Sequence, residues 1–227
     1  MIKVRNLTKY YGRATALRNL NLDINAGECV AVFGRNGAGK TTFLRIVAGL
    51  ARPCSGSVKI NFSDAETPRY ARGSIGFLSH GMSLYSDLTA LENLRFFAGL
   101  MNARTDDGAL IRRIEDVGLA GREHEPARNY SRGMLQRLAI ARAFLHDPAI
   151  LLLDEPFTGL DNIGRGVLKT YIRRAVSEGK ICVMTLHDPA LGYELAERLV
   201  VMEKGAAALD VPKQSLTLED YTLACGC

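Results

Sequence analysis

The eight residues Gly34-Arg35-Asn36-Gly37-Ala38-Gly39-Lys40-Thr41 decide the fold. They fit the pattern G-x-x-x-x-G-K-[ST], which marks a phosphate-binding loop when a strand precedes it and a helix follows it. Both are predicted here, because residues 30–33 are apolar and strand-like and residues 40–50 repeat apolar side chains at helical spacing. In such a loop, glycines let backbone N–H groups curve around phosphate oxygens, and the start of the helix attracts anions. The sequence therefore predicts an α/β fold built around a phosphate site.

The loop also predicts which side chains hold a nucleotide. Lys40 is expected to reach the β- and γ-phosphates, where it also assists the reaction, and the Thr41 hydroxyl is expected to bind Mg²⁺. A glycine-rich turn that binds nothing is the alternative, but the strand, the helix and the fixed letters of the pattern argue against it. The expected nucleotide-binding residues of this stretch are Gly34, Arg35, Asn36, Gly37, Ala38, Gly39, Lys40, Thr41 and Thr42.

A pair of carboxylates ends an apolar strand later in the chain. Residues 151–153 are leucines, and Asp154 and Glu155 follow them. A strand of a parallel sheet delivers such residues at its carboxyl edge, where ligands of these folds bind. Asp154 is then a candidate Mg²⁺ ligand, and Glu155 is a candidate base that orients and deprotonates the attacking water. Two solvated carboxylates at the start of a loop are the alternative, which loses weight beside a phosphate loop.

His187 follows the next predicted strand, residues 181–184. A lone histidine is more often structural than functional, but this one lies just past a strand end and can face the same pocket. An imidazole there could hydrogen-bond the γ-phosphate and hold the attacking water. We therefore interpret His187 as a catalytic candidate beside Glu155 and Lys40.

Length and composition limit the possible classes of protein. The chain has 227 residues, of which 47% are hydrophobic and 23% charged, an ordinary globular mixture that excludes a disordered or fibrous chain. Apolar runs such as residues 149–153 are far shorter than the roughly 20 residues that cross a bilayer. No apolar signal segment opens the chain, so a cytoplasmic location is expected. The net charge of +5 comes without long blocks of like charge, so no nucleic-acid partner is expected.

The order of the predicted elements indicates one domain. Strands alternate with helices, which implies a mainly parallel core sheet covered on both faces. An antiparallel β part opens the chain within residues 1–33, and a helical subdomain is expected near residues 88–145. A helix is expected over residues 189–199. Since no linker divides the chain, residues 1–227 are expected to form a single domain.

The cysteines predict reduced thiols, because their number is odd and their spacing is scattered. Cys225 and Cys227 stand close together in the tail and could bind a metal, but two thiols do not complete a tetrahedral site. A frayed tail is the expectation that we favour.

These features together resemble one family closely, the ATP-binding subunits of ABC transporters. The stretches that resemble its motifs are, in chain order, the Walker A loop at residues 34–41, the signature motif at residues 130–134, the Walker B aspartate Asp154, the catalytic glutamate Glu155, the D-loop at residues 158–161 and the switch histidine His187. The motifs follow the order of the family and extend over most of the chain. The resemblance implies a P-loop NTPase fold of the ABC ATPase type and the hydrolysis of ATP to ADP and phosphate.

The resemblance also implies a working pair of subunits. In the family, two subunits pair head to tail, and ATP lies between the Walker A loop of one and the signature motif of the other. Ser131 and Gly133 would therefore bind the nucleotide of a partner, either a second copy or a paired ATPase subunit. Their place at a predicted helix start makes a ready anion site. Tyr11 resembles the aromatic residue that stacks on adenine, with Tyr10 as the alternative.

Further implications of the resemblance concern cofactors, partners and cargo. It implies ATP and Mg²⁺ as cofactors, integral membrane subunits as separate chains, and a peripheral position at the cytoplasmic face of the inner membrane. Residues 84–97, with Ser79-His80 and the signature motif, are most similar to the haem exporter subunits of cytochrome c maturation. Exporters of drugs, lipids or polysaccharides share much of this pattern. A soluble ABC ATPase acting on nucleic acid or ribosomes is disfavoured, because the chain holds one module and no coiled-coil heptads.

The chain departs from the family at two places. After the predicted strand 75–78 the family has a glutamine whose amide oxygen reaches Mg²⁺, whereas this chain has His80. Since Mg²⁺ prefers oxygen ligands, His80 would act through water or only couple motion, with direct metal contact as the other alternative. In the signature motif, Arg132 replaces a glycine and could add charge near the nucleotide or face solvent.

Overall fold

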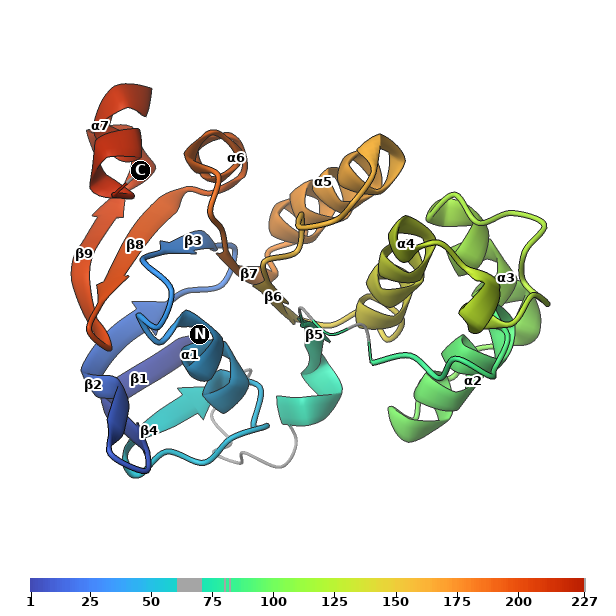
Figure 1. Cartoon of the computed structure of the whole chain (residues 1–227), viewed down its shortest axis with the longest axis horizontal. Helices are drawn as coiled ribbons and strands as arrows, with labels where there is room; N and C mark the ends of the chain where they lie inside the picture. The colour runs from blue at the N-terminus through green and yellow to red at the C-terminus, as the bar shows by residue number, and fades with distance from the viewer. Residues whose placement is uncertain (61–70, 80, 82, 227) are drawn as a thin grey trace.

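The computed structural model of the chain describes residues 1–60, 71–79, 81 and 83–226 and contains two β-sheets (Figure 1). The strands are β1 (Ile2–Tyr11), β2 (Ala14–Ile24), β3 (Cys29–Phe33), β4 (Ser55–Ile60), β5 (Ile75–Leu78), β6 (Ile150–Asp154), β7 (Ile181–Thr185), β8 (Arg198–Glu203) and β9 (Ala206–Pro212). An antiparallel sheet has the order β2-β1-β4, and a larger sheet has the order β5-β6-β7-β3-β8-β9. The larger sheet is parallel except for β9, which pairs antiparallel with β8.

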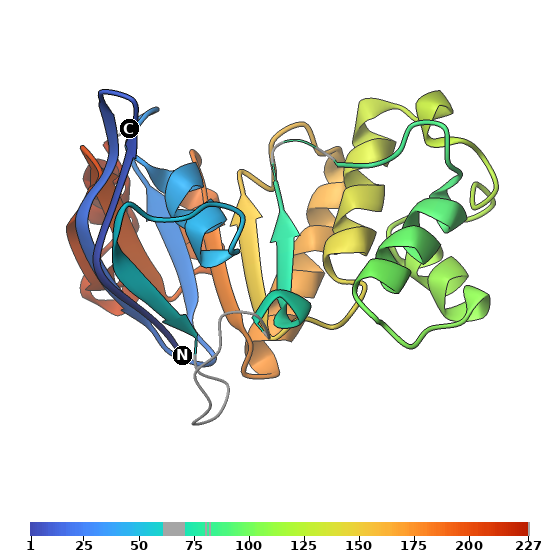
Figure 2. The same ribbon diagram turned by 90° about the horizontal axis from the view of Figure 1, so that it is seen from below.

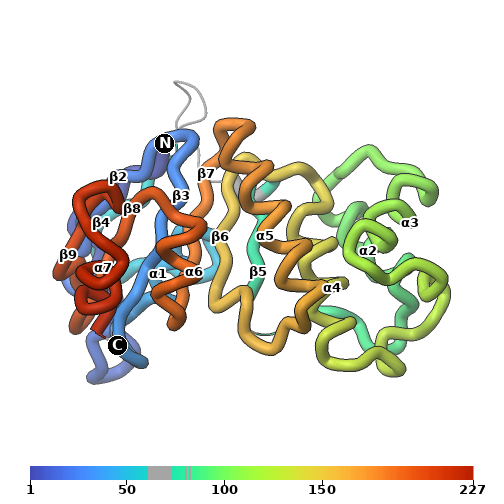
Figure 3. The backbone as a smooth tube through the Cα atoms, turned by 90° about the horizontal axis from the view of Figure 1, so that it is seen from above, coloured from blue at the N-terminus to red at the C-terminus, as the bar shows by residue number. Residues whose placement is uncertain are grey.

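The helices are spread along the molecule (Figures 1 and 2). They are α1 (Lys40–Val47), α2 (Ala90–Leu100), α3 (Asp107–Asp116), α4 (Arg132–Ala143), α5 (Asn162–Ser177), α6 (Pro189–Leu195) and α7 (Leu218–Ala224), with short 3₁₀ turns at Ala71–Ser74, Ala127–Asn129 and Lys213–Ser215. Helices α5 and α4 lie between α6 on one side and α2 on the other. Helices α2 and α3 lie at one end of the molecule, whereas both termini lie in the part that carries the sheets (Figure 3). None of the helices in the described ranges is long and apolar enough to span a bilayer.

The larger sheet is covered on both faces, which confirms the predicted, mainly parallel core. All of β3 is buried, and its side chains alternate between two apolar clusters. Cys29, Ala31 and Phe33 face the cluster that includes α4, α5 and α7, whereas Val30 and Val32 face the cluster shared with β1, β2 and α1. A strand buried in this way needs cover on both faces, so its sequence reads as an unbroken apolar run.

The loops that follow three parallel strands place the site at one edge of this sheet. The strands β3, β6 and β7 are neighbours in the parallel order, so their carboxyl ends point the same way. Gly34 follows β3, Glu155 follows β6 and Leu186 follows β7. The motifs predicted to act together are therefore delivered to the same edge.

Two expectations about the elements were wrong. The helix α6 ends at Leu195 and not at residue 199, because Ala196 is extended at φ −96° and ψ 153° and leads into β8. The tail is not frayed over residues 218–225: Thr217 and Asp220 form a capping box at the start of α7, and Tyr221 and Cys225 are buried. A helix this short is not stable by itself, so its tertiary packing stabilises it. Cys227 lies outside the described residues.

Asn93 joins the loop before α2 to that helix and is fully buried. Its amide nitrogen donates to the carbonyls of Tyr85, Leu88 and Thr89 at 3.0, 3.2 and 2.9 Å, and its amide oxygen accepts from the Tyr85 N–H at 2.8 Å. Asn93→Ala leaves several backbone groups unpaired and should lower the free energy of unfolding by about 2–4 kcal/mol, measured by urea unfolding.

The matched control is Arg95→Ala on the same helix. It breaks an exposed ion pair with Asp107, which should cost at most about 1 kcal/mol. Equal losses in the two variants would contradict the structural role of Asn93.

Candidate nucleotide-binding site

The phosphate loop joins β3 to α1 and is confined by its neighbours. Gly34, Gly37 and Gly39 have φ angles of 140°, 83° and 103°, a region that residues with a Cβ rarely adopt. A Cβ at Gly34 would lie 2.2 Å from the carbonyl oxygen of Met202, and one at Gly39 would lie 2.3 Å from that of Ala16. Gly34 and Gly39 therefore need glycine for both backbone conformation and space, whereas Gly37 needs it for backbone conformation alone.

Lys40 begins α1 and folds back over the loop. Its Nζ donates to the carbonyls of Gly34 at 2.6 Å and Arg35 at 3.4 Å, and the residue is 6% exposed. Burial lowers the pKa of Lys40, while the nearby carboxylates of Glu155 and Asp154 oppose that shift. Both acceptors are neutral carbonyls, so an anionic phosphate oxygen would be a stronger acceptor for the same ammonium.

Asp154 connects the phosphate loop to the neighbouring strands. Its Oδ1 accepts from the Thr41 hydroxyl at 3.1 Å and from the Thr185 hydroxyl at 2.8 Å, and the residue is 3% exposed. Since Thr41 lies on α1 and Thr185 ends β7, one carboxylate oxygen fixes the relative positions of α1, β6 and β7.

Glu155 and His187 lie beside this buried group but nearer to solvent. Glu155 has a φ of 51°, a left-handed conformation that costs about 1–3 kcal/mol in a non-glycine residue and tends to occur at functional sites. Its N–H donates to the Thr185 hydroxyl at 2.9 Å, and its Oε1 lies 2.7 Å from His187 Nε2. The side chains of Glu155 and His187 are 26% and 50% exposed, so water can reach the pair.

A Mg²⁺ ion fits the donors of this site. The Thr41 hydroxyl oxygen and Asp154 Oδ1 lie 3.1 Å apart, and both are the oxygen donors that Mg²⁺ prefers. In the part of the chain that the structure describes, no cluster of three His, Cys, Asp or Glu side chains could hold a metal unaided. One carboxylate and one hydroxyl suffice where the phosphates of a substrate and water complete the coordination.

The other predicted loop residues lie in the same stretch. Arg35, Asn36 and Gly37 are exposed, whereas Ala38 is buried and Thr42 is half-buried on α1. The backbone around the first three is therefore open to a ligand.

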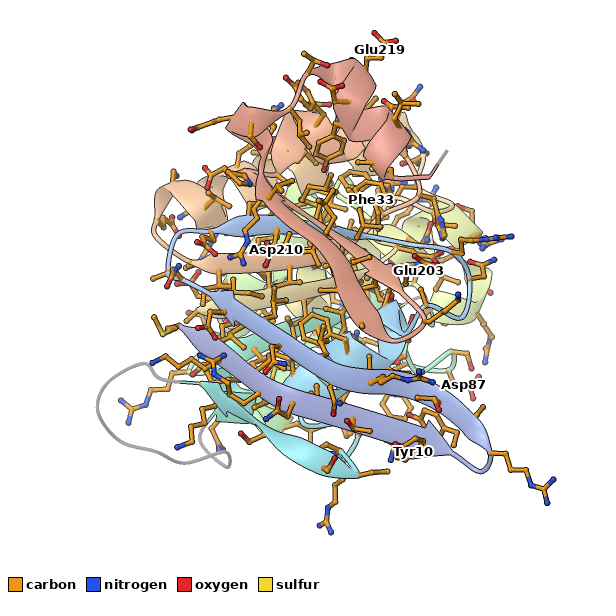
Figure 4. The ribbon with its side chains drawn as sticks, turned by 90° about the vertical axis from the view of Figure 1, so that its left-hand side faces the viewer. Tyr10, Phe33, Asp87, Glu203, Asp210 and Glu219 are labelled. Carbon is orange, nitrogen blue, oxygen red and sulfur yellow. The ribbon has the colours of Figure 1, made fainter. Side chains whose placement is uncertain are left out.

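Tyr11 lies at the end of β1, where the β1–β2 hairpin passes the phosphate loop. The ring is 51% exposed, and the Lys9 ammonium lies 5.0 Å from its centroid. Ala16, on the second strand of the hairpin, borders Gly39. Tyr10 is exposed to a similar extent, at 49%, and Figure 4 shows it on the antiparallel sheet that contains β1.

Ser131 and Gly133 are not brought to the phosphate loop of their own chain. Ser131 is the N-cap of α4, where its hydroxyl accepts from the Met134 N–H at 3.3 Å. Helix α4 lies on the opposite side of β5 and β6 from α1 (Figures 1 and 3). His80, the predicted replacement for the family's glutamine, lies outside the described residues.

Known proteins have similar sequences and the same fold. The family model described as "ABC transporter" matches residues 17–158, more than half of the chain. The chain belongs to the ABC transporter family. As in the other ATP-binding cassettes of this family, its activity is that of an ATPase.

Two relatives illustrate the range of transporters in the family. A cytochrome c biogenesis ATP-binding export protein CcmA from Vibrio cholerae is 38% identical over 83% of this chain and 91% of its own length. A sulfate/thiosulfate import ATP-binding protein CysA 2 from Rhizobium meliloti is 39% identical over 90% of this chain, which spans only 58% of that relative.

A solved structure confirms the fold of the cassette. It is the dimeric structure of a post-hydrolysis state of the ATP-binding cassette MJ0796 bound to ADP and Pi, with 28% identity and a TM-score of 0.84 over 94% of this chain and 99% of that chain.

Sequence reasoning missed Thr185. Its hydroxyl donates to Asp154 and accepts from the Glu155 N–H, so it supports both carboxylates from β7. The available signal was a threonine at the end of an otherwise apolar strand, directly before Leu186-His187. Its partners lie about thirty residues away in the chain, so the sequence alone does not identify them.

Thr185→Val keeps the shape of the side chain and removes this hydroxyl. We expect the ATPase rate to fall about 10- to 100-fold, the usual cost of losing a group that orients a catalytic ligand, with little change in the far-ultraviolet circular dichroism spectrum. The control is Thr170→Val in α5, where the hydroxyl donates only to the Gly166 carbonyl of its own helix at 3.0 Å. Full ATPase activity in Thr185→Val would contradict the role.

Proposed function

We propose that the chain is the ATP-hydrolysing subunit of an ABC exporter and works as one of two subunits paired head to tail. One observation carries this proposal: the phosphate loop, the buried Asp154 and the Glu155–His187 pair meet at one edge of the sheet. A binding switch without turnover would need neither a carboxylate base nor an imidazole beside it.

The loop binds the substrate before any bond changes. ATP would place its phosphates against the exposed backbone of Arg35, Asn36 and Gly37, and the Lys40 ammonium would exchange the carbonyls of Gly34 and Arg35 for phosphate oxygens. Tyr11 would stack on the adenine ring. Thr41 and Asp154 would hold Mg²⁺, which supplies charge neutralisation on the phosphates when bound.

Hydrolysis would use the Glu155–His187 pair. His187 holds a water between its imidazole and the γ-phosphate, and the Glu155 carboxylate accepts a proton from that water. The water oxygen forms a bond to the γ-phosphorus while the bond to the β–γ bridging oxygen breaks, which yields ADP and phosphate. Lys40 stabilises the charge that develops on the β–γ bridging oxygen as ADP leaves.

A second subunit would complete each site. We propose that residues 1–227 form a single ATP-binding domain whose helical subdomain, near residues 88–145, presents Ser131 and Gly133 to the nucleotide of the partner. Both lie at the start of α4, where backbone N–H groups can receive an anion. The likeness to a dimeric cassette supports this pairing.

A groove on the same molecule suits a membrane subunit. It has a volume of about 630 Å³, and its charged lining residues are Lys9, Arg45, Arg52 and Arg142, with no carboxylate among the described lining residues. Tyr11 also lines this groove, so the groove adjoins the proposed position of the adenine. The exposed rings of Tyr85 and Phe96 contact each other nearby. We propose that an acidic and apolar segment of a separate membrane subunit docks here, so that the chain sits peripherally at the cytoplasmic face of the inner membrane. No nucleic-acid partner is part of this proposal.

The cargo is proposed from the resemblance to CcmA, with haem export for cytochrome c biogenesis as the assignment. The alignment with the Vibrio cholerae relative covers most of both chains. The similar identity to CysA 2 makes import of sulfate or thiosulfate the second candidate.

Producing the chain in Vibrio cholerae cells that lack CcmA tests the cargo. We expect restored covalent haem in c-type cytochromes, measured by haem staining, and no restoration by the Lys40→Ala variant. Growth of a CysA-deficient strain on sulfate in place of this result would favour the import assignment.

Glu155→Gln tests the base. It should retain ATP binding but lower turnover about 10²- to 10⁴-fold, the usual contribution of a positioned base, and it should trap an ATP-bound dimer visible by size-exclusion chromatography. Glu219→Gln, on the exposed face of α7, is the control and should behave like the unmodified protein. Normal hydrolysis by Glu155→Gln would exclude the assignment.

A further inference from the structure

The last helix of the chain is anchored by one aromatic ring. Tyr221 of α7 is fully buried and meets Phe33 edge to face at a centroid distance of 5.8 Å and Tyr193 of α6 at 5.4 Å. Figure 4 shows Phe33 beneath α7, whereas Glu219 of the same helix points away from the molecule. Tyr221 therefore joins α7 to both β3 and α6.

The contact of Tyr221 and Phe33 with α6 is tightly packed. A Cβ at Gly192 of α6 would lie 2.7 Å from Phe33 Cζ and 2.7 Å from the Tyr221 hydroxyl oxygen. Within the described residues that hydroxyl has no hydrogen-bond partner, so the shape of the ring, and not a polar contact, sets the fit. Rigid aromatic contacts of this kind transmit a displacement from one element to the next.

Both neighbours of Tyr221 lead directly to the site. Phe33 is followed by Gly34, the first residue of the phosphate loop. Helix α6 begins at Pro189, two residues after His187, and its N-cap Asp188 accepts from the Ala190 N–H at 2.9 Å. The orientation of α6 therefore constrains the position of the His187 backbone.

Helix α6 is held from two sides. On one side Glu194 accepts from Lys169 and Arg173 of α5, both at 2.6 Å. These are partly exposed ion pairs, which contribute little to rigidity. On the other side the packing of Tyr221 is fully buried, so it is the stronger constraint on the helix.

We propose that Tyr221 is a positioning residue for ATP hydrolysis: its ring fixes α6 against β3 and so holds His187 Nε2 at Glu155 Oε1. This inference rests on the proposed role of His187 in turnover. Tyr221 itself does not touch the reacting atoms, so its removal should affect the rate of hydrolysis more than the binding of ATP.

The test compares steady-state kinetics of variants of the full chain. Tyr221→Ala should lower kcat about 10- to 100-fold, the loss that a misplacement of about 1 Å costs, and leave the KM for ATP within about two-fold. Tyr221→Phe keeps the ring and should rescue the rate to within about two-fold of the unmodified protein. A loss of the same size in Tyr221→Phe, or a full rate in Tyr221→Ala, would overturn the proposal.

A double-mutant cycle separates positioning from a general loss of stability. In a His187→Ala background, Tyr221→Ala should cause no further loss of kcat, whereas independent effects would multiply and overturn the proposal. Leu22→Ala, at a buried position of β2 in the other apolar cluster, is the control for destabilisation. An equal fall of kcat in Leu22→Ala would show that Tyr221 is only structural.

A second variant covers the case in which Tyr221→Ala does not fold. Gly192→Ala forces a methyl group into the same contact from α6 and should lower kcat with a similar KM; an unchanged kcat would overturn the proposal. If His187→Ala keeps its full rate, the proposed function of His187 fails and this inference fails with it. If His187→Ala loses its rate while the Tyr221 and Gly192 variants keep theirs, only this inference fails.

Discussion

The site depends on one oxygen atom, Asp154 Oδ1, which accepts from Thr41 and Thr185 together. These hydroxyls belong to the helix after the phosphate loop and to the neighbouring strand β7, so the carboxylate ties three segments together at the carboxyl edge of the sheet. Thr185 also receives the N–H of Glu155, and Glu155 in turn meets His187. Each contact in this series therefore helps to position the next residue.

Burying this group costs free energy that the fold offsets locally. Asp154 and Lys40 are charged and almost wholly buried, and charges taken out of water are expensive unless they are paired or hydrogen-bonded. Asp154 is satisfied by hydroxyl donors, and Lys40 by the carbonyls of its own loop. These partners are ones that a metal ion and phosphates can replace, so the arrangement is stable alone and still ready to bind.

The local parts of this architecture were predictable and the long-range parts were not. The phosphate loop, the strand before it and the helix after it follow from consecutive letters, and the parallel core follows from apolar runs such as residues 150–153. Thr185 and Tyr221 gain their importance from partners far away in the chain, and a single sequence carries no signal for such pairs. The tail was mispredicted for the same reason, because α7 is short and is held by Phe33 and Tyr193.

The position of α4 gives a physical reason for pairing. Ser131 begins that helix across β5 and β6 from the phosphate loop, so the anion site at its start cannot reach the nucleotide of its own chain (Figure 1). The Asp161 carboxylate lies beside Gly133 at this helix start and pairs with Arg137 at 3.6 Å. The field of the exposed helix start still favours an external anion, and a nucleotide held on a second copy is such an anion. Each chain would then supply one half of two identical sites, as a two-fold axis requires. Asp154 holds the phosphate-loop half of such a site in place within one chain, so a second chain would need to supply only the half that carries Ser131.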